Sequence, residues 1–217
     1  MSRNIPFIED HYYHIYNRGT EERKIFLNES YYKRFIALLY LCNSTEPVRS
    51  SPLQGRTLQN VFKVDRKDTL VDICTYCLMP NHFHILIREK TTGGISKFMQ
   101  KLLTAYTMYF NTKNERTGAL FQGKFKAKII NEDEYLWNLI SYIHLNPIKL
   151  IEPTWRESGI MNKKSAESFL QKYKHSSYLD YYGEQRPEQI LINKTVLPES
   201  IGVAKDIADM ANDLMSL

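Results

Sequence analysis

The chain has 217 residues, of which 43% are hydrophobic and 24% charged; its formal net charge at pH 7 is +5, a mild excess that alone implies little about partners. That length suits one sizeable domain, or one domain with appendages, and the composition is ordinary for a soluble globular protein. No apolar run reaches the roughly 18 residues that a membrane span needs, and no apolar signal core follows Met1, so we expect a cytoplasmic protein without a membrane partner.

The first half of the chain alternates between strand-like and helix-like patterns. Residues 11–17 are rich in aromatic and β-prone side chains and predict a first strand, which residues 18–20 end. Apolar residues recur at helical spacing over about 29–42 and predict a helix. Residues from about 44 to 68 are expected to form a flexible insertion, because Ser, Pro and Gly are frequent in its first part.

A hairpin and a second helix follow. Residues 71–78 predict a strand, the Pro80-Asn81 pair predicts a turn, and residues 82–89 predict the returning strand. The two glycines after this hairpin open a helix of about 96–111. The pair of strands is therefore expected to be antiparallel.

Residues 124–146 predict one more strand and one more helix. Residues 124–130 alternate basic and apolar side chains, as a half-exposed strand does. Residues 131–134 predict a cap and an acidic first turn for a helix that ends at Asn146-Pro147. The order strand, helix, strand, strand, helix, strand, helix predicts an α+β sandwich, with helices packed on a mostly antiparallel sheet.

The chain is expected to divide into a domain at 1–150 and a C-terminal extension at 151–217 that packs on or flanks it. Near the C-terminus one further amphipathic helix is predicted, with acidic residues on its outer face. Its apolar positions are Ile201, Ala204, Ile207, Ala208, Ala211 and Leu214.

The histidines of the hairpin are the most informative residues. Residues i and i+2 of a strand share a face, so His82 and His84 can converge on one ion while Phe83 enters the core. Imidazole suits transition metals, and a site with oxygen co-ligands also accepts manganese or magnesium. The alternative is a pair of surface histidines on an edge strand. A catalytic interpretation therefore needs a third ligand and a reacting group.

The helix that ends at Pro147 offers both. Its apolar stripe is formed by Leu136, Ile140 and Ile143, and its polar stripe by Asn138, Tyr142 and Asn146. Residues i and i+4 stack on one helical face, so the Tyr142 phenol and the Asn146 carboxamide can meet the same metal. Because Pro147 disfavours helical geometry at Asn146, we expect a frayed last turn there. Taken singly, Tyr142 is also explained as an amphipathic residue at the core edge, and Asn146 as a helix stop.

Between Lys101 and Lys128 the chain carries a cationic segment with only one acid, Glu115. Five aromatic residues are interleaved with its six basic ones: Tyr106, Tyr109, Phe110, Phe121 and Phe125. Phosphates attract cations and unstacked bases stack on rings, so a nucleic-acid surface and a solvated face are equally good interpretations.

The three cysteines, Cys42, Cys74 and Cys77, fit a reducing compartment, since a sparse, odd set is no disulfide framework. Cys74 and Cys77 have the spacing of a zinc knuckle, but no second such pair exists. Residues three apart on a strand also point to opposite faces. Buried small apolar residues are the better account.

Four stretches carry a resemblance to a known family. "MPNHFHILI" resembles the His-hydrophobe-His motif of single-tyrosine transposases of the IS200-like superfamily. "FQGKFKAKII" followed by "LISYIHLNPIKL" resembles the REP-associated tyrosine transposase branch. The similarity runs from about residue 12 to residue 150, and "HSSYLDYY" at 175–182 resembles a short motif that often follows.

The resemblance implies a ferredoxin-like sandwich that cuts single-stranded DNA. It implies that Tyr142 is the nucleophile, which forms a 5′-phosphotyrosine during DNA transposition and strand transfer. It implies that His82, His84 and Asn146 hold a divalent cation, Mg or Mn, although some relatives have Gln at the last position. Single-stranded or hairpin DNA becomes the expected partner, and a role on the nucleoid follows. The residues expected to contact DNA are Arg18, Lys101, Tyr106, Arg116, Gln122, Lys124 and Lys126.

Two alternatives stay open at this point. One is a domesticated protein on the same fold that binds hairpin or single-stranded DNA without cutting it. The other is a hydrolase or zinc protein that uses Cys77 together with His82 and His84. The sequence leaves monomer and homodimer undecided, because the wider superfamily often dimerises and can exchange the tyrosine helix, whereas the REP-associated branch resembles monomers.

Overall fold

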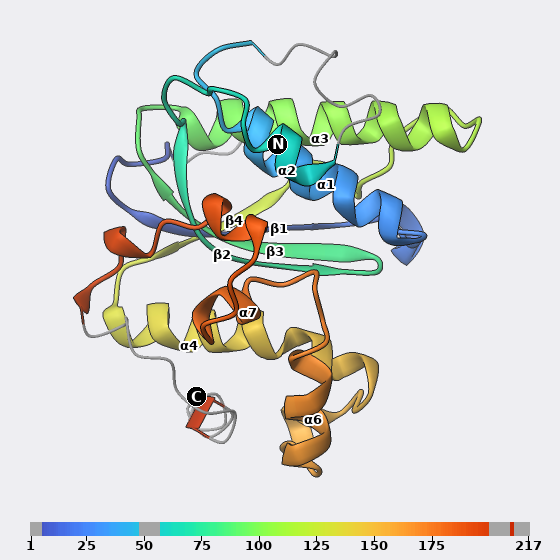
Figure 1. The fold of residues 1–217 in the computed structure, drawn as a ribbon, viewed down its shortest axis with the longest axis vertical. Helices are drawn as coiled ribbons and strands as arrows, with labels where there is room; N and C mark the ends of the chain where they lie inside the picture. The colour runs from blue at the N-terminus through green and yellow to red at the C-terminus, as the bar shows by residue number, and fades with distance from the viewer. Residues whose placement is uncertain (1–5, 48–56, 200–208, 211–217) are drawn as a thin grey trace.

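The structure, a computed structural model, describes residues 6–47, 57–199 and 209–210. Its centre is a four-stranded sheet in the order β2-β3-β1-β4, in which every neighbouring pair is antiparallel (Figure 1). The strands are β1 (Tyr12–Arg18), β2 (Val71–Met79), β3 (His82–Glu89) and β4 (Lys126–Ile130). The tight turn between Met79 and His82 confirms the predicted hairpin.

Helices cover both faces of the sheet. In Figure 1, α1 (Glu29–Cys42) and α3 (Gly94–Lys113) lie above the sheet, and α4 (Asp133–Leu145) lies below it. The chain order β1-α1-β2-β3-α3-β4 with this strand order is the ferredoxin-like arrangement. The predicted α+β sandwich is therefore confirmed.

Short helices fill the connections and the C-terminal part of the chain. They are η1 (Thr20–Glu22), α2 (Leu58–Val61), η3 (Asn146–Leu150), α5 (Trp155–Ser158), α6 (Lys163–Leu170), α7 (Tyr178–Tyr181), η4 (Pro187–Leu191) and η5 (Lys194–Val196). None of the helices within the described ranges is both long enough and apolar enough to cross a bilayer.

The two faces of the sheet have different chemistry because side chains alternate along each strand. Toward α1 and α3 the strands present apolar side chains such as Ile15, Phe83 and Ile85, each 0% exposed. Toward α4 the same strands present His14 and His84 next to an apolar cluster built on α4. The face below the sheet thus carries His14 and His84.

The C-terminal part of the chain packs along β2, which is an edge strand of the sheet. The backbone N–H of Leu78 donates to the carbonyl of His175 at 2.9 Å, and that of Ser177 donates to Tyr76 at 2.9 Å. Farther along, the N–H of Asn193 donates to Ile73 at 2.8 Å. These bonds satisfy backbone groups that an open edge would leave unpaired.

Several local predictions need correction. Cys74 and Cys77 lie in the same apolar cluster on the α4 side, because an irregularity between Ile73 and Thr75 shifts the alternation of β2. The strand predicted at 124–130 begins at Lys126, and α4 begins after Glu132 without a side-chain cap. The insertion contains the short helix α2. The helix expected at 201–214 lies outside the described residues, apart from 209–210.

Candidate active site

The hairpin turn before His82 is held in place by the segment after β1. The backbone N–H of Gly19 donates to the carbonyl of Asn81 at 2.9 Å, and that of Ile25 donates to Pro80 at 2.8 Å. Gly19 has to lack a side chain, since a Cβ there would lie 2.3 Å from the carbonyl oxygen of Arg23. The start of β3 is therefore fixed before any ligand arrives.

His82 is oriented by its neighbour Asn81. The Nδ1 atom of His82 lies 2.7 Å from Oδ1 of Asn81, and the amide nitrogen of Asn81 donates to the carbonyl of Glu22 at 3.3 Å. Because this second bond sets the amide orientation, Nδ1 of His82 is the donor and its Nε2 is left with a lone pair. Burial lowers the pKa of His82, which favours the neutral ring.

The end of α4 brings Asn146 to that lone pair. Oδ1 of Asn146 lies 3.3 Å from Nε2 of His82. Asn146 is 4% exposed and has helical dihedrals, φ −52° and ψ −37°. The expected frayed turn is therefore wrong: Pro147 is the second residue of the 3-10 helix η3, where its missing N–H costs nothing, and the chain stays helical through Asn146.

His84 is paired with a third histidine, His14 of β1. Nε2 of His14 lies 2.8 Å from Nδ1 of His84, and the two rings stack with centroids 5.0 Å apart. Burial lowers the pKa of His14 to about 4, and it also lowers the pKa of His84 well below its usual value. Both rings are therefore neutral near pH 7 and share one N–H. The sequence analysis did not include His14 in the site.

Tyr142 lies beside these histidines on α4. Its ring centroid is 5.3 Å from that of His84, and the guanidinium carbon of Arg156 lies 4.9 Å from the centre of the Tyr142 ring. Burial raises the pKa of Tyr142, whereas the positive charge of Arg156 and a hydrogen bond from Asn146 each lower it. The predicted polar stripe of α4 thus brings Tyr142 and Asn146 to the two histidines of β3, all within one chain.

The donor set fits a divalent cation. With Nδ1 of His82 as the donor, its Nε2 and Oδ1 of Asn146 are both acceptors 3.3 Å apart, and a cation can bridge their lone pairs. Two ligands of one Mg²⁺ at about 2.1 Å and at right angles lie about 3.0 Å apart, close to this separation. Imidazole nitrogen with amide oxygen is also a ligand set that Mn²⁺ accepts. Residues His82, His84 and Asn146 remain our proposed ligands.

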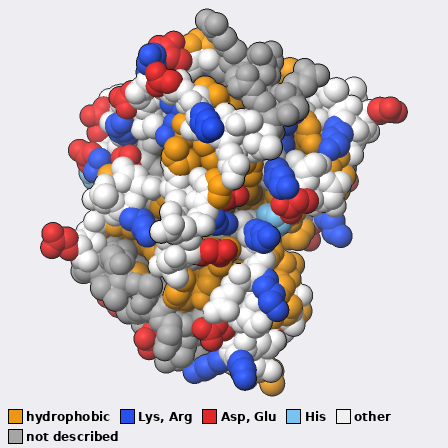
Figure 2. Space-filling model, viewed as in Figure 1, with side chains coloured by type: hydrophobic (Ala, Val, Ile, Leu, Met, Phe, Trp, Pro, Cys, Tyr) orange, Lys and Arg blue, Asp and Glu red, His pale blue; other side chains and the backbone are white. Residues whose placement is uncertain are grey.

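A groove of about 800 Å³ opens next to His82. Its cationic lining residues are Arg18, Lys24, Lys126 and Lys149. Among the described residues, ion pairs include Arg18 with Glu22 but none of these three lysines. On the face shown in Figure 2, basic and acidic side chains are interspersed. The three lysines without an ion pair make the groove suitable for a polyanion.

Three of the residues predicted to contact DNA line this groove: Arg18, Gln122 and Lys126. Arg18 Nε donates to Oε1 of Gln122 at 2.5 Å, which ties the end of β1 to the loop before β4. Lys126 shares its face of the sheet with His14 and His84 through the register of β1. Two further lysines of the lining, Lys24 and Lys149, were missed because they lie outside the cationic segment.

Of two other predicted DNA contacts, Tyr106 is wrong, and Lys101 lies away from the groove, so its DNA contact stays a prediction. Tyr106 is 0% exposed and donates its hydroxyl to the carbonyl of Ile25 at 2.6 Å, so its ring is part of the core and cannot stack on a base. Lys101 lies on α3, on the far side of the sheet from α4, and its ammonium donates to the carbonyls of Ser44 and Glu46. Helical spacing alone did not show which face of α3 enters the core.

The remaining two predicted contacts, Arg116 and Lys124, lie outside the groove lining. The Arg116 guanidinium donates to Oδ1 of Asn111 at 2.5 Å and to the carbonyl of Ala119 at 3.2 Å, which ties the end of α3 to the loop after it. Lys124 is exposed just before β4. A DNA contact by either residue stays a prediction.

The zinc interpretation of Cys77 is wrong. Cys77 is 0% exposed, and burial raises the pKa of its thiol, which disfavours the thiolate that a metal needs. Within the described ranges, His, Cys, Asp and Glu side chains form no cluster of three or more that could hold a metal ion. The proposed site differs because its third ligand is the amide of Asn146.

The comparison with protein families decides the assignment. Residues 7–146, more than half of the chain, match the family described as transposase, IS200-like. The chain belongs to this family. The match ends at Asn146, so it includes all four residues of the proposed metal and nucleophile set but leaves out Arg156.

Among solved structures, this IS200-like transposase is similar to a REP-associated tyrosine transposase bound to a REP hairpin. The two chains share 12% sequence identity with a TM-score of 0.52, and the likeness covers 95% of this chain and 93% of the other. At that identity the likeness concerns the fold. No curated protein matches the chain.

Proposed function

We propose that this IS200-like transposase cuts single-stranded DNA with Tyr142 and joins strands through a 5′-phosphotyrosine intermediate. The observation that carries the proposal is the position of Asn146: its Oδ1 lies 3.3 Å from Nε2 of His82, and its amide lowers the pKa of Tyr142, one helical turn away. One amide thus connects the nucleophile with the proposed cation site. A protein that only bound DNA would not need this connection.

The chemical step needs only one bond made and one broken. The hydroxyl oxygen of Tyr142 attacks the scissile phosphorus, the bond from phosphorus to the 3′ oxygen breaks, and that oxygen leaves as a 3′-hydroxyl after taking up a proton. Tyr142 loses its proton in exchange, so charge and atoms balance. Because the phosphotyrosine keeps the energy of the diester, a 3′-hydroxyl can reverse the step and join strands.

The residues around Tyr142 assist the loss of its proton. A phenol with a pKa near 10 is a weak nucleophile at neutral pH, and burial raises the pKa of Tyr142 further. The guanidinium of Arg156 and the hydrogen bond from Asn146 both favour the phenolate. A divalent ion, Mg or Mn, held by His82, His84 and Asn146 would neutralise charge on the scissile phosphate and orient it.

The groove beside His82 supplies a path for the DNA. Its volume of about 800 Å³ and its uncompensated lysines suit a sugar-phosphate chain, and Tyr16 in its lining offers a ring for stacking. The structural neighbour is bound to a REP hairpin. We therefore propose hairpin or single-stranded DNA as the substrate class, with a site complete in one chain.

The test is a denaturing gel of labelled single-stranded and hairpin oligonucleotides incubated with protein and Mn²⁺. The wild-type protein should produce a nick and a covalent DNA–protein adduct that maps to Tyr142. Tyr142→Phe keeps the ring but lacks the attacking oxygen, so it should lose both products together. Tyr109→Phe, on α3, is the matched control and should cleave normally.

The other outcomes are distinct. Cleavage that persists in Tyr142→Phe and leaves free 5′ ends would identify a hydrolase, and the proposal would be wrong. Binding without any nick or adduct in the wild-type protein would identify a domesticated DNA-binding protein on the same fold. An adduct that maps to another tyrosine would contradict the assignment of the nucleophile.

A further inference from the structure

A second pocket, of about 360 Å³, lies beside Tyr142. Its lining includes Tyr142 and two cations, Lys128 and Arg156, whereas the larger groove includes none of these three. Tyr16 lines both cavities and therefore lies at their boundary. The nucleophile thus belongs to the smaller pocket, and His82 belongs to the larger groove.

Arg156 is held at this pocket by the fold of the C-terminal extension. Its neighbour Trp155 is 4% exposed and packs in an apolar cluster with Leu145 and Ile148. The carboxylate of Glu152 accepts hydrogen bonds from the backbone that follows α5, at 2.9 and 3.2 Å. The Arg156 side chain is exposed, yet its backbone is fixed close to the end of α4.

Lys128 approaches the same pocket from β4. It pairs across the sheet with His14, so its side chain lies on the face that carries the histidines. Its ammonium donates to the hydroxyl of Tyr135 at 2.8 Å and lies 4.2 Å from the centre of that ring. Both contacts are with neutral groups.

The positive charge of the pocket is uncompensated. Within the described parts of the chain, neither Arg156 nor Lys128 forms an ion pair, whereas Arg186 is bound to Asp180 at 2.5 Å. The pocket therefore holds two cations without an ion pair, one from β4 and one from the C-terminal extension, beside the proposed nucleophile. This arrangement favours an anionic group that arrives with the substrate.

We propose that this pocket holds the strand that remains attached to Tyr142, with Arg156 and Lys128 binding the first phosphate after the scissile one. The inference rests on the proposed function. When the bond to the 3′ oxygen breaks, the downstream strand stays linked to Tyr142 through its 5′ phosphate, so its first nucleotide remains next to the nucleophile. The strand that ends in the 3′-hydroxyl is free to leave through the larger groove. Arg156 is thus a binding residue from outside the matched family region.

The first experiment needs no cleavage and no metal. Tyr142→Phe, with and without Arg156→Gln, is titrated with a mixed-sequence single-stranded oligonucleotide over a range of salt concentrations. Each phosphate contact on a single strand contributes about 0.7 to the slope of log affinity against log salt. The Arg156→Gln change should lower the magnitude of the slope by about that amount. Arg156→Lys, which keeps the charge, should leave it unchanged, as should Lys164→Gln on the exposed surface of α6.

The second experiment locates the phosphate. In an oligonucleotide that the wild-type protein cleaves, the first phosphate after the scissile one is replaced by an uncharged methylphosphonate. This replacement should weaken DNA binding by Tyr142→Phe strongly and DNA binding by Tyr142→Phe/Arg156→Gln less, because only Lys128 then contacts that phosphate. A methylphosphonate upstream of the scissile phosphate should weaken DNA binding by both proteins equally.

The outcomes separate the two proposals. If the wild-type protein cleaves no oligonucleotide, the proposed function fails, while the salt slopes still report whether Arg156 binds a phosphate. An unchanged slope in the Arg156→Gln variant overturns the inference. The assigned position of the phosphate is overturned if Arg156→Gln lowers the affinity for the normal oligonucleotide and for the methylphosphonate oligonucleotide by the same factor.

Discussion

His14 of β1 and His84 of β3 share a hydrogen bond of 2.8 Å between Nε2 and Nδ1. The two residues are diagonal neighbours across the strand pair, since His14 lies opposite Leu86 and His84 opposite Tyr16. If Nδ1 of His84 is the donor, its Nε2 keeps a lone pair, which is the form that a metal ligand requires. His82 shows the same pattern with Asn81 as its partner. Both histidines of β3 therefore have a neighbour that can fix the ligand tautomer.

The first prediction follows from this pairing. Replacing His14 by Phe keeps a ring in the site but removes the acceptor for Nδ1–H of His84. Loss of such an outer partner typically costs 10- to 100-fold in metal affinity, so we expect His14→Phe to bind Mn²⁺ about 10-fold or more weakly. Isothermal titration calorimetry of the DNA-free protein measures the change.

Two variants control this measurement. His14→Gln retains an acceptor oxygen at this position and should keep most of the affinity. His11→Gln changes an exposed histidine near the start of β1 and should have no effect. Equal Mn²⁺ affinity in His14→Phe and the wild-type protein would show that His14 does not support the site.

The second prediction compares two lysines of the cationic segment that the structure separates. Lys126 lines the groove beside His82, whereas Lys101 is bound to backbone carbonyls on the far side of the sheet. We expect Lys126→Gln to weaken single-stranded DNA binding and to reduce the salt slope by about 0.7. Lys101→Gln should leave DNA binding unchanged and lower the free energy of unfolding by about 1 kcal/mol, since it removes two hydrogen bonds to backbone carbonyls. Fluorescence anisotropy and urea denaturation measure the two effects; equal DNA affinities for both variants would contradict the assignment.

The strand and helix patterns were sufficient to predict the elements that carry the site. The alternation around Phe83 placed His82 and His84 on one face, and the structure has Phe83 0% exposed in the core. The spacing of Tyr142 and Asn146 along one stripe of α4 was also correct, because these positions depend only on the period of each element.

Contacts between separate elements could not be predicted in this way. His14 is 70 residues away from His84 in the chain, and only the strand register brings them together. Arg156 reaches Tyr142 because Trp155 packs in an apolar cluster. The periodic patterns of the sequence do not predict that contact. Tyr106 shows the opposite problem: an aromatic residue between basic ones has the pattern of a nucleic-acid surface, yet tertiary packing placed it in the core.

The third prediction concerns the amide of Asn146. Asn146→Asp replaces a neutral oxygen ligand by an anionic one at the same position, so it should bind Mn²⁺ more tightly than the wild-type protein does. Asn146→Leu has a similar volume but no ligand atom, and we expect at least a 10-fold loss of affinity, comparable to the loss of an outer partner. Calorimetry of the three proteins should show that Mn²⁺ affinity decreases in the order Asp, Asn, Leu at position 146. An unchanged affinity in Asn146→Leu would exclude this residue as a ligand.

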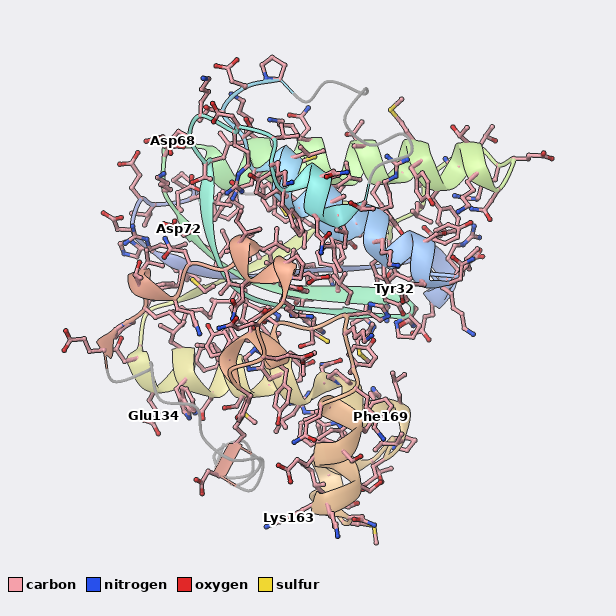
Figure 3. The ribbon with its side chains drawn as sticks, viewed as in Figure 1. Tyr32, Asp68, Asp72, Glu134, Lys163 and Phe169 are labelled. Atoms are coloured by element: carbon pink, nitrogen blue, oxygen red, sulfur yellow. The ribbon has the colours of Figure 1, made fainter. Side chains whose placement is uncertain are left out.

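The last prediction concerns the contact between the C-terminal extension and α1. The ring of His175 stacks on Tyr32 of α1, with centroids 3.6 Å apart and planes at 8°, and Tyr32 lies at the lower edge of α1 in Figure 3. Burial lowers the pKa of His175, and the nearby carboxylate of Glu29, 3.3 Å away, opposes that shift without cancelling it. The other charged groups around the ring lower its pKa further: Arg186, Lys174 and Lys33.

A lowered pKa in the folded state means that the unfolded chain binds more protons below the ordinary pKa of about 6.5. The stability contributed by neutral His175 is therefore fully present above about pH 6.5 and declines as the pH falls toward the folded value. We expect His175→Phe, which keeps a stacking ring but cannot titrate, to lose less stability than the wild-type protein between pH 7 and about pH 5. His175→Ala should be less stable at pH 7 by about 1 kcal/mol, the value of an aromatic pair. Urea denaturation of the three proteins across this range measures the differences. The prediction is refuted if the wild-type protein gains stability relative to His175→Phe on acidification. That result would mean that the ion pair with Glu29 outweighs burial in setting the pKa of His175.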